Sequence, residues 1–395
     1  MSISFKKLFS SRSSWENQLN SLSIVLKEKR RSGAAIIDLT ESNPTRGSFS
    51  FHSEPWTDAL LDKKNDLYEP DPRGLFHARQ AVCDYYAAKK ITLDPEQIFL
   101  TAGTSEGYSF LMRLLLDLGD VLLCAEPSYP LMDTLSEIHD VVPKKYALRR
   151  APDWRIDQDP LSEGLHCGAR ALVLVNPNNP TGNFVSPEEK RKINGLCAKV
   201  SCALIVDEVF LDYAWDKARV AESFASNEEV LTFTLSGISK VLALPQMKVS
   251  WIVVSGPRAL REEALARLEI IADAYLSVNT PCQHALGTWL SRQNTVQEEI
   301  LARVRANAAY LKKMSLEYPA IQMLPAQGGW YAVLERQGTV TDEQMALRLL
   351  NEMDVLVHPG FFYDFVSENI LVLSLIVEES AFQEGARRIF QMLTP

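Results

Sequence analysis

The stretch ALVLVNPNNPTG (171–182) joins a short apolar run to a turn-forming sequence. An uninterrupted run of alanine, valine and leucine of this length is typical of a strand that is buried on both faces. Asn, Pro and Gly favour tight turns, so NPTG alone has an ordinary explanation as a chain reversal. The stretch becomes informative because other expected strands of this chain are also followed directly by polar residues.

Short apolar runs alternate with longer amphipathic segments through much of the chain. The other runs are AIIDL (35–39), QIFLT (97–101), VLLCAEP (121–127), ALIVD (203–207), LTFTL (231–235) and WIVVS (251–255). Strands that alternate with helices predict a mainly parallel sheet with helices on both faces. Ligands of such sheets bind at the carboxyl ends of the strands, so functional residues are expected there.

Helical patterns occupy both ends of the chain. Apolar residues recur at helical spacing from Trp15 and predict a helix over about 15–31. Ser186, followed by Pro187 and Glu189, predicts a helix start with a capping box. A long helical segment is expected over about 257–316, and the strands IQML, GGWYAVLE and ILVLSLI then alternate with helices. This last part indicates a smaller α+β unit.

Composition excludes several classes of protein. The net charge is −9, from 41 basic and 50 acidic residues without a block of one sign, which argues against nucleic acid as a partner. The six cysteines are scattered and form no CxxC pair, so neither a metal site nor a disulfide framework is expected. No apolar segment has the length of a membrane span or signal peptide. We therefore expect a cytoplasmic protein that does not bind membranes.

Polar residues follow three of the expected strands. Asn176 to Gly182 follow ALVLV, Asp207 ends ALIVD, and Lys240 lies in SGISK after LTFTL. Each has a simple structural explanation on its own: a turn, an acidic residue at a strand end, and a solvated surface lysine. In a parallel sheet these strand ends lie at one edge, so together they indicate a site.

The order and spacing of these residues resemble the class I and II aminotransferases, which are pyridoxal 5′-phosphate (PLP) enzymes of fold type I. The resemblance runs from about residue 35 to the C-terminus. It implies an α/β fold, with a large domain around a mostly parallel sheet of the seven-stranded type and a small α+β domain. The implied divisions are 1–48 for an N-terminal arm with part of the small domain, 49–285 for the large PLP-binding domain, and 286–395 for the small C-terminal domain.

Three residues carry the chemistry that the resemblance implies. A lysine must form a Schiff base with the cofactor aldehyde and later move a proton at the substrate α-carbon, which is the role of Lys240. A carboxylate must keep the pyridine nitrogen protonated, because the protonated ring takes up electrons, and Asp207 matches it. Asn179 matches the residue that hydrogen-bonds the 3′-oxygen of the cofactor.

The cofactor phosphate needs backbone N–H groups and hydroxyls at a helix N-terminus. The segment TAGTSEG (101–107) follows a strand and opens a helix, as the family's phosphate loop does, and an ordinary helix cap fits the same segment. The resemblance assigns Gly103, Thr104 and Ser105 to the phosphate, with Ser239 as a second source of a hydroxyl. Lys248 occupies the place of a phosphate-binding arginine, and it keeps the charge without the two-pronged geometry.

Two aromatic residues complete the implied cofactor site. Tyr129, in PSYP, matches the residue that stacks on the pyridine ring. Tyr68, in YEPDPRG, matches a tyrosine that reaches the phosphate of the neighbouring subunit. The resemblance therefore implies a homodimer with shared active sites.

The sequence departs from the family pattern after Asp207. The family commonly has a tyrosine three residues further on, whose hydroxyl also contacts the 3′-oxygen, and here that residue is Phe210. A hydrogen bond that favours the deprotonated lysine–cofactor linkage is then missing, so this linkage is expected to titrate at a higher pH than in relatives with tyrosine. Tyr213 is an alternative source of the hydroxyl.

A second departure concerns the substrate. After a VxPG turn, here Val357 to Gly360, the family has an arginine that pairs with the substrate α-carboxylate, and its position falls on Val372. Candidates for a substitute are Arg46, in the segment after residues 40–43 that lines the substrate pocket in relatives, and Arg73. Ser42 and Asn43 are further candidate substrate contacts. The turn residue His358 has either a substrate-binding or a structural role.

Three functions remain open at this point. The chain is an aminotransferase that acts on an amino acid and a 2-oxo acid, with its carboxylate clamp built from other residues. Alternatively, the same scaffold carries out β/γ-replacement, cyclisation or oxidation. In the third hypothesis the substrate is an amine without a carboxylate, or the protein is a sensor. The 34 residues before the first expected strand leave no room for a DNA-binding domain, which argues against a transcriptional regulator.

Overall fold

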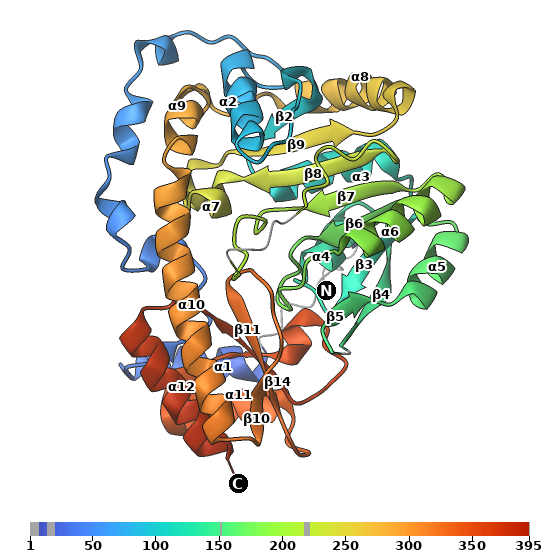
Figure 1. Ribbon diagram of the computed structural model, residues 1–395. Coiled ribbons are helices and arrows are strands. Elements are labelled where there is room, and N and C mark those ends of the chain that lie inside the picture. Colours follow the sequence, from blue (N-terminus) through green and yellow to red (C-terminus); the bar gives the residue numbers. More distant parts are fainter. Residues whose placement is uncertain (1–7, 14–19, 151, 217–221, 395) are drawn as a thin grey trace.

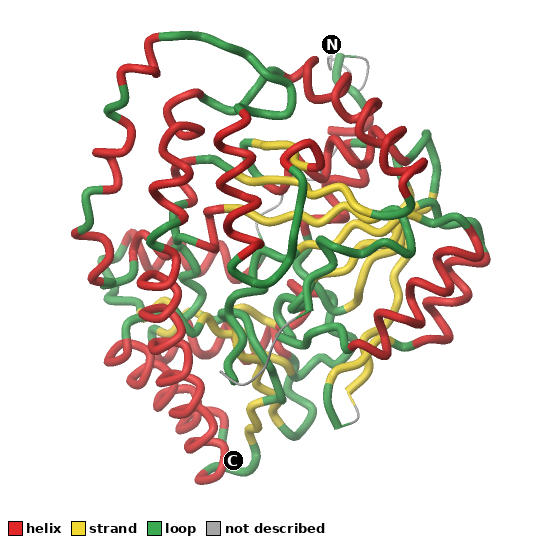
Figure 2. The backbone as a smooth tube through the Cα atoms, turned by 45° about the horizontal axis from the view of Figure 1, so that its top comes forward, coloured by secondary structure: helices red, strands yellow, loops and turns green. Residues whose placement is uncertain are grey.

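The fold is built around a sheet of eight strands, which the computed structural model shows between two layers of helices (Figures 1 and 2). The structure describes residues 8–13, 20–150, 152–216 and 222–394. The strands follow the order β2 (Ile98–Thr101), β9 (Ser250–Ser255), β8 (Thr232–Gly237), β7 (Ala203–Asp207), β6 (Ala171–Val175), β3 (Val121–Glu126), β4 (Val142–Arg150) and β5 (Trp154–Ile156).

The neighbours from β8 to β4 pair in parallel, whereas β9 is antiparallel to both β2 and β8. The expectation of a mostly parallel sheet is therefore confirmed. The sheet has eight strands instead of the seven-stranded form, because β5 pairs antiparallel with the end of β4 and adds a short edge. Strands β4 and β5 were not predicted from the sequence, and the charged residues of VPKKYALRR explain why β4 lacks the uniform apolar pattern.

Alternation along the strands creates one hydrophobic layer on each face of the sheet. In β7, Ala203 and Ile205 pack into the layer beneath α3 (Thr104–Leu115), α4 (Leu131–Ile138) and α8 (Arg258–Tyr275). Leu204 and Val206 pack into the opposite layer. That layer is covered by α2 (Phe76–Ala87), α5 (Gln158–His166), α6 (Pro187–Val200) and α9 (Thr280–Leu290). Both faces of these strands are buried, which explains their continuous apolar runs.

A smaller sheet lies beside the long helix α10 (Gln293–Glu317), in the lower part of Figure 1. Its strand order is β10 (Ile321–Met323), β11 (Tyr331–Arg336), β14 (Ile370–Ser374) and β13 (His358–Pro359), all antiparallel. Helices α1 (Ser21–Arg31), α11 (Asp342–Met353) and α12 (Glu379–Leu393) complete this part. Strand β1 (Ile37–Asp38) pairs with β12 (Val355–Leu356), so both chain ends contribute to it, while the boundaries at 48 and 285 stay a prediction.

Helix predictions were partly right. The capping box at Ser186 and Glu189 is present and opens α6. The helical segment expected over 257–316 is confirmed, and it consists of three separate helices, α8, α9 and α10. Leu276 has a left-handed φ of 65° that ends α8, and Asn279 caps α9. The first α-helix begins at Ser21, and residues 15–19 of the expected helix lie outside the described residues. Within the described residues, no helix is long and apolar enough to cross a membrane.

Gly182 holds the NPTG loop against the chain that leads into β11. Its φ is +70°, and an added Cβ would lie 2.5 Å from the carbonyl oxygen of Gly328. The Gly182 carbonyl also accepts a hydrogen bond from the N–H of Gln327, at 3.0 Å. The glycine is thus needed both for its backbone conformation and for the close approach of two loops.

We expect Gly182→Ala to lower the free energy of unfolding by about 2 kcal/mol, because it adds backbone strain and a backbone clash. Gly195→Ala is the matched control. Gly195 lies in α6 with open space around it, so the alanine should be neutral or stabilising there. Denaturant unfolding of both variants measures the difference, and an equal stability of the two would contradict this explanation.

Candidate active site

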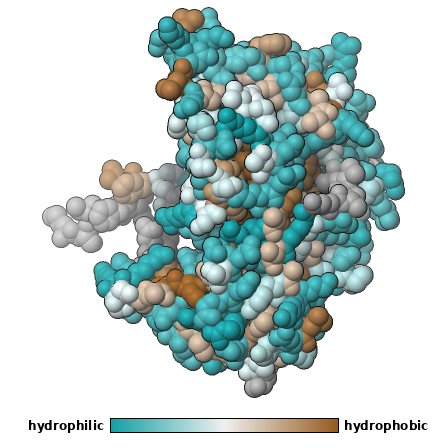
Figure 3. All heavy atoms as spheres, turned by 60° about the vertical axis from the view of Figure 1, so that its left-hand side comes forward, coloured by the Kyte–Doolittle hydropathy of each residue, from teal (hydrophilic) through white to brown (hydrophobic). Residues whose placement is uncertain are grey.

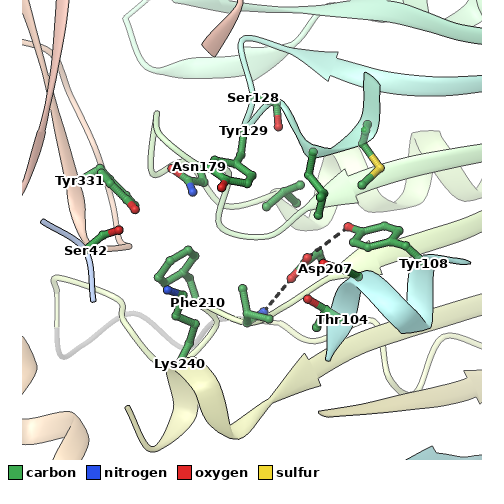
Figure 4. A pocket seen from close by; sticks show the side chains of 15 residues that line it. Ser42, Thr104, Tyr108, Ser128, Tyr129, Asn179, Asp207, Phe210, Lys240 and Tyr331 are labelled. Atoms are coloured by element: carbon green, nitrogen blue, oxygen red, sulfur yellow. Dashed lines mark hydrogen bonds between the residues drawn. The ribbon is translucent and has the colours of Figure 1, made fainter. Parts of the chain in front are cut away.

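A cavity of about 250 Å³ lies where the carboxyl ends of the central strands face the small sheet. Figure 4 shows its labelled side chains converging from both parts of the chain. The lining residues are Ser42, Thr104, Ser105, Tyr108, Ser128, Tyr129, Leu131, Met132, Val175, Asn179, Asp207, Val209, Phe210, Lys240 and Tyr331. The sheet topology explains this meeting point, since β3, β6, β7 and β8 are parallel and end at one edge.

Asp207 is the last residue of β7 and is buried. One carboxylate oxygen of Asp207 accepts a hydrogen bond from the Tyr108 hydroxyl, and the other accepts one from the N–H of Val209. Both hydrogen bonds are 3.1 Å long. Burial raises the pKa of Asp207 to about 6, while these two hydrogen bonds and the charge of Lys240 act in the opposite direction. The carboxylate is therefore fixed in place, and near neutral pH it is mainly ionised.

Lys240 lies in the short helix α7 (Ile238–Val241), directly after β8. Its amine lies over two aromatic rings, 4.8 Å from the centroid of Trp330 and 5.5 Å from that of Phe210. Burial lowers the pKa of Lys240 to about 8, and the charge of Asp207 acts in the opposite direction. A lysine that loses its proton this readily is suited to act as a nucleophile and a base.

Both residues expected near the cofactor 3′-oxygen line the cavity, Phe210 next to Lys240 and Asn179 next to Tyr129 (Figure 4). Asn179 lines the cavity, and its buried Oδ1 has no hydrogen-bond partner among the described residues. The Phe210 ring also lines the cavity and packs edge-on against Trp330. Tyr213 does not replace the missing hydroxyl, because its OH donates to the backbone carbonyl of Lys240 at 2.6 Å. It therefore fixes the lysine backbone.

The residues expected at the phosphate meet at the N-terminus of α3. Thr104 and Ser105 line the cavity, and Gly103 is the N-cap residue. Lys248 precedes β9, whose antiparallel direction brings its start to the same edge of the sheet. An added Cβ at Gly103 would lie 3.4 Å from the Lys248 amine, so the amine lies over this loop. Ser239 is partly exposed in α7 and is not a lining residue.

The two expected aromatic residues differ in position. Tyr129 lines the cavity with half of its surface exposed, so one face of its ring is accessible. Tyr68 does not line the cavity of its own chain and is 66% exposed. Its role at a neighbouring subunit stays a prediction.

Ser42 and Asn43 follow β1, but only Ser42 lines the cavity. The Asn43 side chain accepts hydrogen bonds from Thr45 and caps a short 3-10 turn. Arg46 is 74% exposed at its side chain and pairs with Glu41 at 3.1 Å.

Arg73 is not available as a clamp. Its guanidinium forms ion pairs with Glu96 at 3.0 Å and Glu269 at 2.6 Å, away from the cavity lining.

Val372 is buried in β14, where the sequence comparison with the family places a carboxylate-binding arginine. It is paired with Val333 on one side and His358 on the other. The imidazole Nδ1 of His358 lies 3.1 Å from the Tyr363 hydroxyl, and burial lowers the pKa of His358. The histidine thus has a structural partner and little tendency to carry a positive charge.

Sequence reasoning missed three polar lining residues, Tyr108, Tyr331 and Ser128. Tyr108 lies one helical turn after Thr104, so the helical period alone places it on the same side of α3. Ser128 precedes Tyr129 in the PSYP segment. Tyr331 had no local signal, because its neighbour Trp330 is equally aromatic and only the register of β11 decides which of the two faces the cavity.

The donor set fits PLP. The Asn179 amide, a buried carboxylate at Asp207 and a lysine with a lowered pKa line the cavity that would hold a pyridine ring. Hydroxyls, a glycine cap and the Lys248 amine lie at a helix N-terminus, as a phosphate requires. A parallel α/β sheet with this site at its strand ends defines a fold type I PLP enzyme.

The family model for "Aminotransferase class I and II" matches residues 34–389, and the chain belongs to this family. It is a PLP-dependent aminotransferase. The glutamate-pyruvate aminotransferase AlaA of Haemophilus influenzae is 26% identical over 371 residues, which are 92% of this chain and 91% of that protein. The alanine aminotransferase of Mycobacterium bovis is also 26% identical, over 86% of this chain and 81% of its own length.

The fold is that of the solved aminotransferases. The alanine aminotransferase of Pyrococcus furiosus superposes with a TM-score of 0.88, covering 98% of this chain and 99% of that chain at 21% identity. At this identity the likeness supports the fold and leaves the substrate open.

The lowered pKa of Lys240 predicts its reactivity in the cofactor-free protein. Acylation of Lys240 by a small amine-selective reagent should be half-maximal near pH 8, instead of the ordinary lysine value of 10.5, because only the neutral amine reacts. Asp207→Asn removes the charge that raises this pKa, so the profile should move to lower pH. Peptide mass spectrometry at a series of pH values measures it.

Glu208→Gln is the control for this titration. Glu208 is also buried, but its carboxylate accepts hydrogen bonds from Ser223 and the N–H of Phe224 and does not line the cavity. Glu208→Gln should therefore leave the pH dependence of Lys240 acylation unchanged. A half-point near 10.5 in the unchanged protein would contradict the burial of the amine.

Proposed function

We propose that this protein uses PLP bound at Lys240 to move an amino group between an amino acid and a 2-oxo acid. The observation that supports it most is the placement of Lys240 and Asp207. These two oppositely charged groups follow neighbouring strands and line one cavity together with Asn179. An ordinary structural lysine or aspartate has no reason to be held in this way.

PLP, when bound, supplies an aldehyde that captures the substrate amine and a protonated ring that takes up electrons. Nζ of Lys240 is the base that removes the proton from the substrate α-carbon and then the acid that returns it. Asp207 holds the proton on the pyridine nitrogen, and Tyr108 keeps the carboxylate turned to the cavity through its hydrogen bond. The Asn179 amide is the donor for the 3′-oxygen.

The phosphate is held, in this proposal, by Gly103, Thr104, Ser105 and Lys248, with Ser239 as a further hydroxyl. No ion pair of the described residues involves Lys248, so its charge is available. Tyr129 covers the ring from the side of the β3–α4 loop. The substrate end of the site is atypical, because Val372 stands in the place of the arginine of relatives. Arg46, on the segment after β1, stays a candidate substitute.

We also infer a homodimer with shared active sites. Apolar side chains are exposed along the segment that precedes α2, including Leu61 at 82%, Leu67 at 59% and Tyr68 at 66%. Figure 3 shows brown apolar patches on a mainly hydrophilic surface on this side of the molecule. A second subunit that covers this segment would bring its Tyr68 to the phosphate. A cytoplasmic location is part of the same proposal, supported by six cysteines that are all unpaired.

The half-reaction tests the proposed chemistry. Mixing the holoenzyme with single amino acids should convert the absorbance of the lysine-bound cofactor to that of pyridoxamine phosphate, with one 2-oxo acid formed per site. Lys240→Ala should abolish the starting absorbance, since the covalent link is lost. Release of ammonia or consumption of oxygen without an oxo-acid acceptor would instead indicate replacement or oxidase chemistry, which is the second function that the missing arginine leaves open.

Phe210→Tyr tests the assignment of the 3′-oxygen environment. Restoring the hydroxyl should lower the pKa at which the lysine–cofactor linkage titrates, because the added hydrogen bond favours its deprotonated form. A spectrophotometric pH titration of the two holoenzymes measures it. Tyr213→Phe is the control, since its hydroxyl donates to a backbone carbonyl, and this variant should leave the titration unchanged. If the linkage titrates with the same pKa in Phe210→Tyr as in the unchanged holoenzyme, Phe210 does not lie next to the 3′-oxygen.

A further inference from the structure

The wall of the cavity on the side of the small sheet is made of hydroxyl groups. Tyr331 comes from β11 and Ser42 from the segment after β1, and both line the cavity. Figure 4 shows them side by side, facing Phe210 and Asn179 across the cavity. Tyr331 is only 7% exposed, so its phenol belongs to the inner part of the site.

Strand register relates this wall to the missing arginine. Residues directly opposite each other in an antiparallel pair point to the same face of the sheet. Tyr331 is opposite Ser374, and Val333 is opposite Val372. Since Tyr331 faces the cavity, Val372 and Ser374 belong to the same face. The buried Ser374 hydroxyl has no partner among the described residues. This face thus carries hydroxyls beside the position at which relatives have a guanidinium.

Positive charge is scarce among the described residues that line the cavity. Lys240 is the only Lys or Arg among the described residues that line the cavity. Arg46 pairs with Glu41, and Lys145 pairs with both Asp133 and Asp364. No guanidinium therefore lies among the described residues that line the cavity.

We propose that Tyr331, which lies beside Ser42 in the cavity wall, binds the carboxyl end of the substrate through its uncharged phenol O–H in place of an arginine. The inference rests on the proposed function and names its specificity-determining residue. It also defines the substrate class. Neutral donors bind a carboxylate oxygen and an amide oxygen similarly, so the site accepts amino acids and their uncharged α-carboxyl derivatives, such as amides.

The phenol remains a donor over the physiological range. Burial raises the pKa of Tyr331 to about 12, and a hydrogen bond from Ser42 acts in the opposite direction. The neighbouring Glu41 carboxylate also raises the pKa of Tyr331. A protonated phenol can donate to the substrate, whereas a phenolate would repel a carboxylate.

The experiment compares Tyr331→Phe and Ser42→Ala with the unchanged holoenzyme. KM and kcat are measured with an amino acid that reacts and with its α-amide. Tyr331→Phe should raise both KM values about tenfold or more and change kcat less than about threefold, because a hydrogen bond to the ground state and transition state is lost. Ser42→Ala should also raise both KM values, but by a smaller factor.

Tyr363→Phe is the matched control. Its hydroxyl lies against His358 and does not line the cavity, so KM should stay within about twofold. Ionic strength gives an independent readout. KM of the unchanged enzyme should vary little between about 50 mM and about 500 mM salt, whereas a clamp built on exposed Arg46 would weaken as salt screens it. Arg46→Ala is included for this comparison.

Binding of an α-methyl amino acid separates this inference from the proposed reaction. Such a compound has no α-proton to lose, so its Kd reports recognition alone. Weaker binding of this compound by Tyr331→Phe supports substrate binding by Tyr331, even if the enzyme forms no oxo acid. The absence of an oxo acid would overturn only the proposed transamination. An unchanged KM and Kd in Tyr331→Phe would overturn the tyrosine clamp, as would a tenfold loss in Arg46→Ala with strong salt dependence.

Discussion

Two opposite charges buried at the ends of adjacent parallel strands are the constraint on which the site depends. Asp207 ends β7 and Lys240 follows β8, and burial moves their pKa values toward each other, to about 6 and about 8. Removing ions from water is costly, so the chain must hold both with fixed partners. Tyr108 and the N–H of Val209 do this for the carboxylate, and Tyr213 fixes the lysine backbone. The remaining lining residues are arranged around this pair.

The sheet direction extends the constraint to the phosphate end. Because β9 runs antiparallel to β2 and β8, its first residue, Ser250, lies opposite both Thr101 and Gly237. The start of β9 thus brings Lys248 to the same edge as the ends of the parallel strands. A lysine only eight residues after Lys240 in sequence therefore lies over the α3 loop, although neither helical nor strand periodicity predicts it.

The sequence predicted most of the strands and the residues that follow them, since apolar runs and turn residues are local signals. It failed where the outcome depends on packing. The break between α8 and α9 is marked by Asn279 and Pro281, a cap pattern that the helical composition around it concealed. Charged residues disguised β4. Tyr331 was unpredictable because adjacent strand residues face opposite sides, and only the register against β14 turns it to the cavity.

Charge is distributed unevenly across the cavity, and this separates reaction from recognition. Asp207 and Lys240 follow strands of the large sheet, whereas the small sheet supplies the buried Val372 and the hydroxyl of Tyr331. A carboxylate entering this end loses water without gaining a paired cation, so its binding depends on how well the hydrogen bonds replace hydration. In the proposed recognition by Tyr331, substrate choice is set by the fit of oxygen atoms to the phenol and only weakly by net charge. Such a site would serve a broader set of amines than an arginine-based site permits.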